Sequence, residues 1–163
     1  MIRTNGQPSS GRGFTLIEVV TMVLVLAIAV PPTLEIMMSS SASRANLINT
    51  SRATMLASNV LEGVLADVAS DDDDLGFDAL ADASAYLSTP TTGLYSRMSS
   101  VTDLYDSLGL TYVVTISGLI GPEGSVSGIE SENIFRTVTV RVSYPSADGA
   151  AYILPVSLMV SSL

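Results

Sequence analysis

A long apolar segment, Phe14 to Met38, constrains this chain more than any other feature of its sequence. A helix needs about 20 apolar residues to cross the hydrocarbon core of a bilayer, and this segment is long enough. Two positive residues, Arg3 and Arg12, precede it, and most of the acidic residues follow it. This charge asymmetry predicts a single-pass membrane helix over 14–38, with the N-terminus in the cytoplasm and the C-terminal domain outside.

Glu18 is an acid inside this apolar segment, where a plain membrane anchor has none. An unpaired carboxylate at membrane depth costs a few kcal/mol, so an acid in this place indicates a function. If the chain is cut between Gly13 and Phe14, the new α-amino group of Phe14 on a neighbouring subunit is a cation at the same depth. That cation could neutralise Glu18 and set the stagger between subunits. The alternative is that Glu18 lies near the membrane interface and stays hydrated.

The ten residues from Gly11 to Val20 (GRGFTLIEVV) closely resemble the cleavage and methylation motif of type IV prepilins and type II secretion pseudopilins. The resemblance implies that residues 1–13 are a leader, that Gly13 is its last residue, and that Phe14 becomes the N-methylated first residue. It also implies that Glu18 serves methylation and subunit docking. The implied partners are a prepilin peptidase/methyltransferase, other pilin or pseudopilin subunits, and an inner-membrane assembly platform.

The same resemblance implies a location and a role. The protein is expected to sit in a bacterial inner membrane with its C-terminal domain in the periplasm, and then to enter a type IV pilus-like filament or a type II secretion pseudopilus. The stretch Arg52 to Glu62 is similar to the helix of I-type pseudopilins and V-type minor pilins, which favours a minor subunit. The sequence does not separate secretion from pilus, and the acid-rich loop and small sheet do not exclude a major subunit.

A rival processing site lies at Ala27-Ile28-Ala29, which has the A-x-A form of a signal-peptidase site. Cleavage there would start the mature chain at Val30 and make it a secreted binding or adhesion domain with an ordinary signal segment. Glu18, which interrupts the apolar core, and the prolines that follow the site oppose this alternative.

The composition excludes several classes of function. The sequence has no cysteine, no histidine and no lysine, which leaves few residues for an active site or a transition-metal site. No nucleophile motif such as G-x-S-x-G is present, so we predict that the chain is not an enzyme. The formal net charge of −9 argues against nucleic-acid binding, which depends on neutralising phosphates with basic residues.

The segment 39–69 is predicted to be a second, amphipathic helix. Pro31 and Pro32 indicate a kink or local melting, or else the end of the anchor, and the small polar residues 39–43 indicate the membrane exit. A helix is then predicted over 44–69, whose apolar stripe packs against a sheet or, alternatively, forms a coiled coil. The stripe comprises Leu47, Ile48, Met55, Leu56, Val60, Leu61, Val64, Leu65 and Val68.

A run of acids, Asp71 to Asp74, follows this helix. Calcium is the ion that such oxygen ligands suit, so a calcium site is one interpretation. Its ligands would be Asp71, Asp72, Asp73, Asp74 and Asp78, with Asp82. The alternative is that the run is a solvated end of the helix, because its spacing does not match an EF-hand. No other metal or cofactor is predicted.

The remainder, 70–163, is predicted to be an extracytoplasmic head with a loop region and a three-stranded antiparallel sheet. Alternating apolar residues predict strands over 110–117, 134–144 and 151–160, and a short helix is predicted over 101–108, opened by Ser99 or Ser100 and closed by Gly109. Asp148-Gly149 is a turn signal, and Pro155 indicates an edge strand or a bulge. The predicted fold class is therefore α+β and pilin-like, with a long N-terminal helix packed on a small C-terminal sheet.

Overall fold

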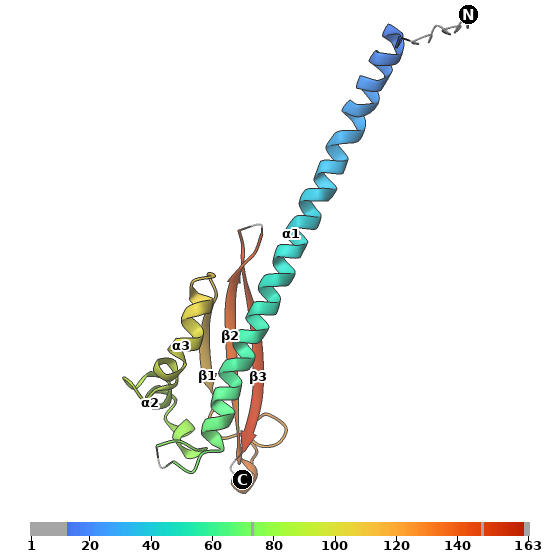
Figure 1. The fold of residues 1–163 in the computed structure, drawn as a ribbon. Coiled ribbons are helices and arrows are strands. Elements are labelled where there is room, and N and C mark those ends of the chain that lie inside the picture. The colour runs from blue at the N-terminus through green and yellow to red at the C-terminus, as the bar shows by residue number, and fades with distance from the viewer. Residues whose placement is uncertain (1–12, 73, 148, 162–163) are drawn as a thin grey trace, which may run out of the picture. The chain divides into compact units, whose positions relative to one another are not determined.

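A computed structural model describes residues 13–72, 74–147 and 149–161. The chain divides into two compact units, 1–41 and 42–163, and each unit is considered by itself below. One helix, α1 (Leu16–Val68), contributes residues to both units. Figure 1 shows α1 as the blue to green helix. Its apolar N-terminal part is long and apolar enough to cross a membrane, which agrees with the predicted single-pass anchor.

Helix α1 is continuous where the sequence predicted an interruption. Pro31, Pro32 and residues 39–43 all lie inside it, so the predictions of local melting at the prolines and of a break in the helix at 39–43 are wrong. The hydroxyl groups of this part of α1 donate hydrogen bonds to backbone carbonyls of the preceding turn, so these polar side chains are accommodated within the helix. Thr33 Oγ1 donates to the carbonyl of Val30 at 2.7 Å and is 3.2 Å from that of Ala29. The helix ends at Val68, one residue before its predicted end.

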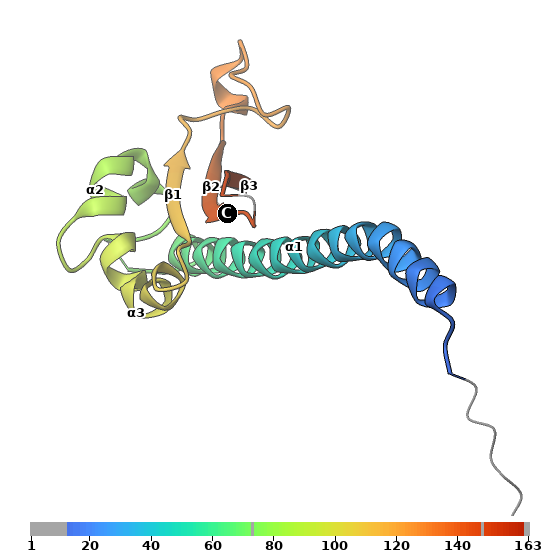
Figure 2. The ribbon, with the colours of Figure 1, turned by 90° about the horizontal axis from the view of Figure 1, so that it is seen from above.

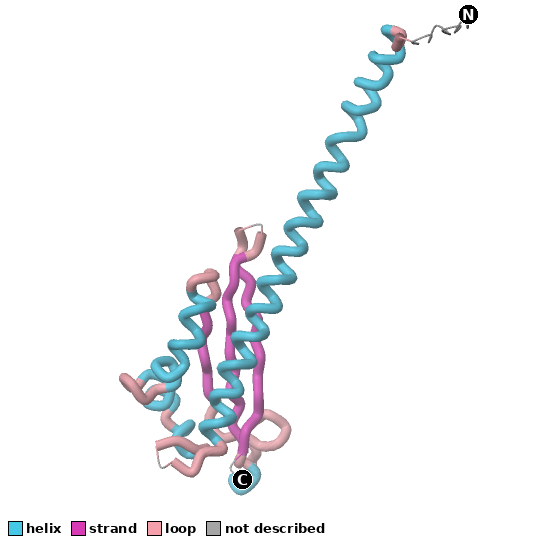
Figure 3. The backbone as a smooth tube through the Cα atoms, viewed as in Figure 1, coloured by secondary structure: helices cyan, strands magenta, loops and turns pink. Residues whose placement is uncertain are grey.

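The second unit contains the predicted three-stranded antiparallel sheet. Its strands are β1 (Thr111–Ile116), β2 (Phe135–Pro145) and β3 (Ala151–Ser161), in the order β1-β2-β3. Figure 3 shows the three strands beside the C-terminal part of α1. The α+β fold class is confirmed: a long N-terminal helix packs on a small C-terminal antiparallel sheet, as in the pilin-like architecture.

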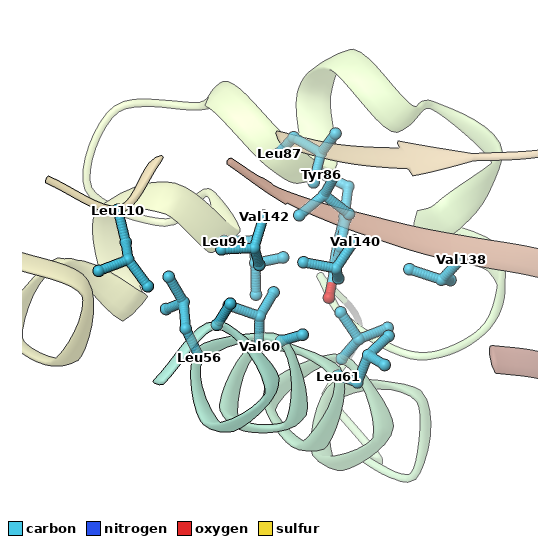
Figure 4. Close-up of a cluster of buried hydrophobic side chains, with 14 of the residues drawn as sticks. Leu56, Val60, Leu61, Tyr86, Leu87, Leu94, Leu110, Val138, Val140 and Val142 are labelled. Carbon is cyan, nitrogen blue, oxygen red and sulfur yellow. The ribbon is translucent and has the colours of Figure 1, made fainter. Parts of the chain in front are cut away.

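The core lies between α1 and the inner face of the sheet. The fully buried side chains of α1 include Leu56, Val60 and Val64, and those of β2 include Val138 and Val140. Figure 4 shows Leu56, Val60 and Leu61 of α1 pointing towards Val138, Val140 and Val142. Alternation along β2 places these valines inside and threonines outside, as predicted.

The predicted apolar stripe of the helix was wrong at four positions. Leu47, Ile48, Met55 and Leu65 are exposed, and Ala53 and Ala57 are fully buried instead. Two of the buried positions of α1 therefore hold small alanine side chains, so the buried face follows shape as well as hydrophobicity. Leu56, Val60, Leu61 and Val64 occupy the core as predicted.

Short helices occupy the part of the head that was predicted to be a loop region. They are the 3₁₀ helix η1 (Asp78–Ala81), α2 (Ala83–Ser88) and α3 (Leu94–Asp106), while η2 (Glu130–Glu132) lies in the β1–β2 connection. Figures 1 and 2 both show α2 and α3 beside β1, on the side away from β3. Helix α3 begins at Leu94, well before the predicted opening at Ser99 or Ser100. Leu94 is buried and follows an extended Gly93, which fixes the start.

Strand β3 is an edge strand, as Pro155 predicted. The backbone groups of Phe135 bond to Ile120, and the carbonyl of Thr137 accepts from the N–H of Ser117. The odd-numbered residues of β2 therefore point their backbone N–H and C=O groups towards β1. The pair Arg141–Pro155 is therefore a non-hydrogen-bonded pair, and the proline nitrogen points to the free edge of the sheet. In the turn between β2 and β3, Gly149 has a positive φ of 85°. Its predicted turn partner, Asp148, lies outside the described residues.

Candidate functional site

The N-terminus of α1 holds the residues that the sequence singled out. Thr15 caps the helix: its Oγ1 accepts from the backbone N–H of Glu18 at 3.3 Å, and its carbonyl accepts from the same group at 3.0 Å. The spacing Thr15-x-x-Glu18 is that of a capping box, in which the acid sits at the third helical position. This cap was missed in the sequence, although its S/T-x-x-E pattern was visible.

Gly13 and Phe14 precede the cap and lie outside the helix. Both are exposed, and a side chain built at Gly13 would have no neighbour within 4 Å. Among the described residues, no other part of the chain packs over the peptide bond between them. An uncovered, non-helical peptide is what a protease needs, because it must take its substrate in an extended form.

Glu18 lies at one end of a shallow groove on the surface of α1. The groove is lined further along by Thr21, Met22, Val25 and Leu26, which follow at helical spacing. These residues are exposed in the isolated chain. An apolar stripe at this spacing fits the side of another helix, and Glu18 is the charged residue of that stripe. Its position in the first turn also favours a carboxylate, because the helix N-terminus carries partial positive charge.

The acidic run after α1 does not gather into a metal centre among the described residues. No group of three or more carboxylates there could hold an ion, and Asp73 lies outside them. Asp72 accepts from the N–H of Asp74 at 3.1 Å, which forms a local turn. Asp82 accepts from the N–H of Ala85 at 3.0 Å and caps α2. Asp71 is exposed, and Asp78 opens the helix η1.

A buried ion pair, absent from the sequence predictions, joins α1 to the short helices. Arg97 Nη1 and Nη2 each lie 2.6 Å from one of the two carboxylate oxygens of Asp67. The hydroxyl of Tyr86 donates to Asp67 Oδ2 at 2.5 Å, and Arg97 Nε donates to the carbonyl of Thr92 at 2.7 Å. Asp67 follows Val60 and Val64 on the buried face of α1, and this helical spacing was the signal that could have revealed it.

Burial and hydrogen bonding shift the pKa values of Tyr86 and Arg97 in this cluster. Burial, and then the hydrogen bond to Asp67, raises the pKa of Tyr86 above its ordinary value of 10.0. The hydrogen bond to Asp67 raises the pKa of Arg97. A cavity of about 570 Å³ opens beside Tyr86 and Arg97. Because Asp67 and Arg97 satisfy each other, the cluster is a structural clamp between α1 and α3.

No protein-family model matches the chain, and neither a curated protein nor a solved structure matches it.

Proposed function

We propose that this chain is a structural subunit of a pilus-type filament, either a type IV pilus or a type II secretion pseudopilus, and that it is incorporated as a minor component. In this proposal the leader is removed after Gly13, the α-amino group of Phe14 is methylated, and the subunit enters the filament through α1. The carrying observation is the capped start of α1, which presents Glu18 just after an accessible Gly13–Phe14 bond.

The exposed apolar surface of α1 supports this role. Leu16, Ile17 and Ile28 are each at least 70% exposed, although they are strongly apolar. Such a surface must be covered by lipid or by other helices. Exchange of lipid for neighbouring helices leaves the apolar residues out of water in both states, so extraction from the membrane into a filament costs little.

Glu18 then acts as the specific contact. Its carboxylate costs a few kcal/mol at membrane depth when unpaired. An α-amino group has a reference pKa of about 7.7–8.0 and is therefore mostly cationic at neutral pH. In the proposed pairing, the amino group of Phe14 on one subunit meets Glu18 on the next, and the gain is available only when subunits stand at the correct stagger.

The first test is intact mass and N-terminal sequencing of the membrane-extracted protein, expressed with its cognate peptidase. A chain that begins at Phe14 and carries one added methyl group supports the proposal. A start at Val30 would instead indicate a secreted domain with an ordinary signal segment. A chain that keeps Met1 would contradict processing and leave a simple membrane anchor.

A set of variants separates the charge of Glu18 from its place in the cap. Glu18→Gln keeps a capping residue at the third helical position but removes the charge, whereas Thr15→Ala removes the cap oxygen and keeps the charge. We expect both proteins to insert into the membrane. Glu18→Gln should fail to enter filaments and Thr15→Ala should enter them. Normal incorporation of Glu18→Gln would refute the pairing.

A further inference from the structure

The solvent side of α1 in the second unit carries an apolar stripe with basic flanks. We define this outer stripe as Arg44, Leu47, Ile48, Arg52 and Met55. Leu47 is 70% exposed and Met55 58%. At 100° per residue Leu47, Ile48 and Met55 lie roughly opposite the buried Ala53 and Val60, so they point away from the core. Arg44 is exposed, and Arg52 is half-buried at the flank of the stripe. The segment 42–58 contains both arginines and no acid.

The connection between β1 and β2 carries a second exposed apolar surface, with acids instead of bases. We define this distal loop as residues 117–134. Val126 is 74% exposed and Ile129 58%, and Leu119 is exposed as well. The loop contains Glu123, Glu130 and Glu132 and no basic residue.

Hydrogen bonds hold the distal loop in one conformation. The N–H of Ser127 donates to Asn133 Oδ1 at 2.8 Å, and Asn133 Nδ2 donates back to the carbonyl of Ser127 at 3.0 Å. Ile120 pairs with Phe135, and Gly121 bonds to Ser125. A loop fixed in this way pays little ordering entropy when it binds, so its exposed Val126 and Ile129 are presented ready for contact.

The outer stripe and the distal loop lie towards opposite ends of the second unit. Asn49 of α1 donates to the carbonyl of Pro145, and Thr50 bonds to the hydroxyl of Tyr144, so the start of the stripe lies beside the C-terminal end of β2. The distal loop joins the N-terminal end of β2 at Phe135. A strand advances about 3.3 Å per residue, which separates the two ends of β2 by roughly 33 Å.

We propose that the outer stripe of one copy docks on the distal loop of a second copy, in a head-to-tail contact. This inference rests on the proposed filament function and names the surfaces through which the heads meet. Leu47, Ile48 and Met55 would pack against Val126 and Ile129, and Arg44 and Arg52 would face Glu123 and Glu130. Neither arginine makes an ion pair within the described parts of the chain, so both are available.

Charge decides between this contact and a symmetric one. Two outer stripes would bring four arginines together, and two distal loops would bring acids together, so either symmetric dimer places like charges in contact. The mixed contact pairs opposite charges. Because its two surfaces differ and lie towards opposite ends, each copy can bind one more, which gives an open chain of subunits and not a closed dimer.

Disulfide trapping in the full-length protein tests the contact, because the natural chain has no cysteine. Two differently tagged copies, one Ile48→Cys and the other Ile129→Cys, are produced in the same membrane and oxidised. We expect the mixed pair to crosslink at least about tenfold more than either single variant with itself, the ratio given by a preference of about 1.4 kcal/mol. Ile153→Cys, an equally exposed position on β3, is the matched control partner for Ile48→Cys. Equal yields with Ile129→Cys and Ile153→Cys would overturn the proposal.

Charge reversal provides an independent readout. Arg44→Glu with Arg52→Glu should abolish the mixed crosslink, and so should Glu123→Arg with Glu130→Arg in the partner copy. Combining the two charge-reversed copies should restore the mixed crosslink. A variant that had lost its fold would not recover the crosslink in this way. Failure of the combined pair to recover would contradict the proposed pairing of charges.

The two proposals fail in distinguishable ways. The variants lie far along the chain from Gly13 and Phe14, so their N-terminal mass should match that of the unchanged protein. Correct processing and filament entry without the mixed crosslink would remove the head-to-tail contact and leave the filament function. Absence of processing in the unchanged protein would remove the filament function itself.

Discussion

The clamp between Asp67 and Arg97 gives a prediction whose size follows from the structure. Replacing Arg97 with Met keeps the bulk of its stem but removes the guanidinium. Asp67, which is 6% exposed, would then be left with Tyr86 as its side-chain partner. A buried charge without its counter-ion is strongly unfavourable, so we expect Arg97→Met to destabilise the second unit.

The magnitude can be bounded. Breaking a buried ion pair by removing one partner costs about 3–5 kcal/mol. The side chain of Arg97 is 31% exposed, so water screens part of the interaction, and we lower the expected loss to about 2–3 kcal/mol. Domains are typically stable by about 5–15 kcal/mol, so this loss would be a large share of the total.

A double-mutant cycle tests the reasoning more directly. Replacing both members of a buried pair by apolar residues is often nearly neutral, because no charge is left unpaired. Asp67→Leu combined with Arg97→Met should therefore cost less than the sum of the two single changes. We expect a coupling free energy of about 1–2 kcal/mol, within the range for residues in contact.

The assay is guanidinium unfolding of the full chain in detergent. Unfolding is monitored by near-ultraviolet circular dichroism of the six tyrosines, since the chain has no tryptophan. Arg141→Met is the matched control. Arg141 is exposed on β2 and makes no ion pair within the described residues, so its replacement should change stability by less than about 0.5 kcal/mol. If Arg97→Met matches that control, or if the cycle is additive, the clamp does not stabilise the fold.

Three further predictions concern other parts of the second unit. Because the pKa of Tyr86 is raised in the folded state, its contribution to the free energy of unfolding is complete below pH 10 and is lost as the pH rises further. Unfolding curves at pH 9–11 should therefore show a smaller loss of stability with pH in Tyr86→Phe than in the unchanged protein. Gly93→Ala should cost about 1–3 kcal/mol in chemical unfolding, because its new Cβ would lie 2.7 Å from the backbone of Thr89, whereas Gly128→Ala has open space and should be near neutral. Pro155→Thr restores an N–H on the free edge of β3, so light scattering should show more self-association; unchanged scattering would mean that the proline does not protect this edge.

Local patterns in the sequence predicted the elements that depend on near neighbours. The alternation along β2 and β3 gave their positions and faces, because side chains of a strand alternate between the two surfaces whatever the rest of the fold does. Pro155 indicated an edge because it cannot donate to a second ladder. The end of α1 was likewise marked by the acidic run that begins at Asp71, and the helix stops at Val68.

The sequence predictions failed where distant segments meet. Asp67 looked like a polar residue between apolar ones, and only the fold brings Arg97 and Tyr86 to it from two other helices. The acids after α1 behave differently, because Asp72 and Asp82 accept hydrogen bonds from backbone N–H groups two and three residues away and form a local turn and a helix cap.

By itself, the sequence predicted an apolar segment able to cross a membrane and three antiparallel strands, and the start of α1 carries a motif that resembles the prepilin cleavage motif. These features are periodic or contiguous, so near neighbours suffice to define them. The tertiary structure alone decided which residues complete the buried side of α1. Ala53 and Ala57 lie inside while Leu47 and Met55 lie outside, because close packing in the core selects side chains for their fit and not for hydrophobicity alone.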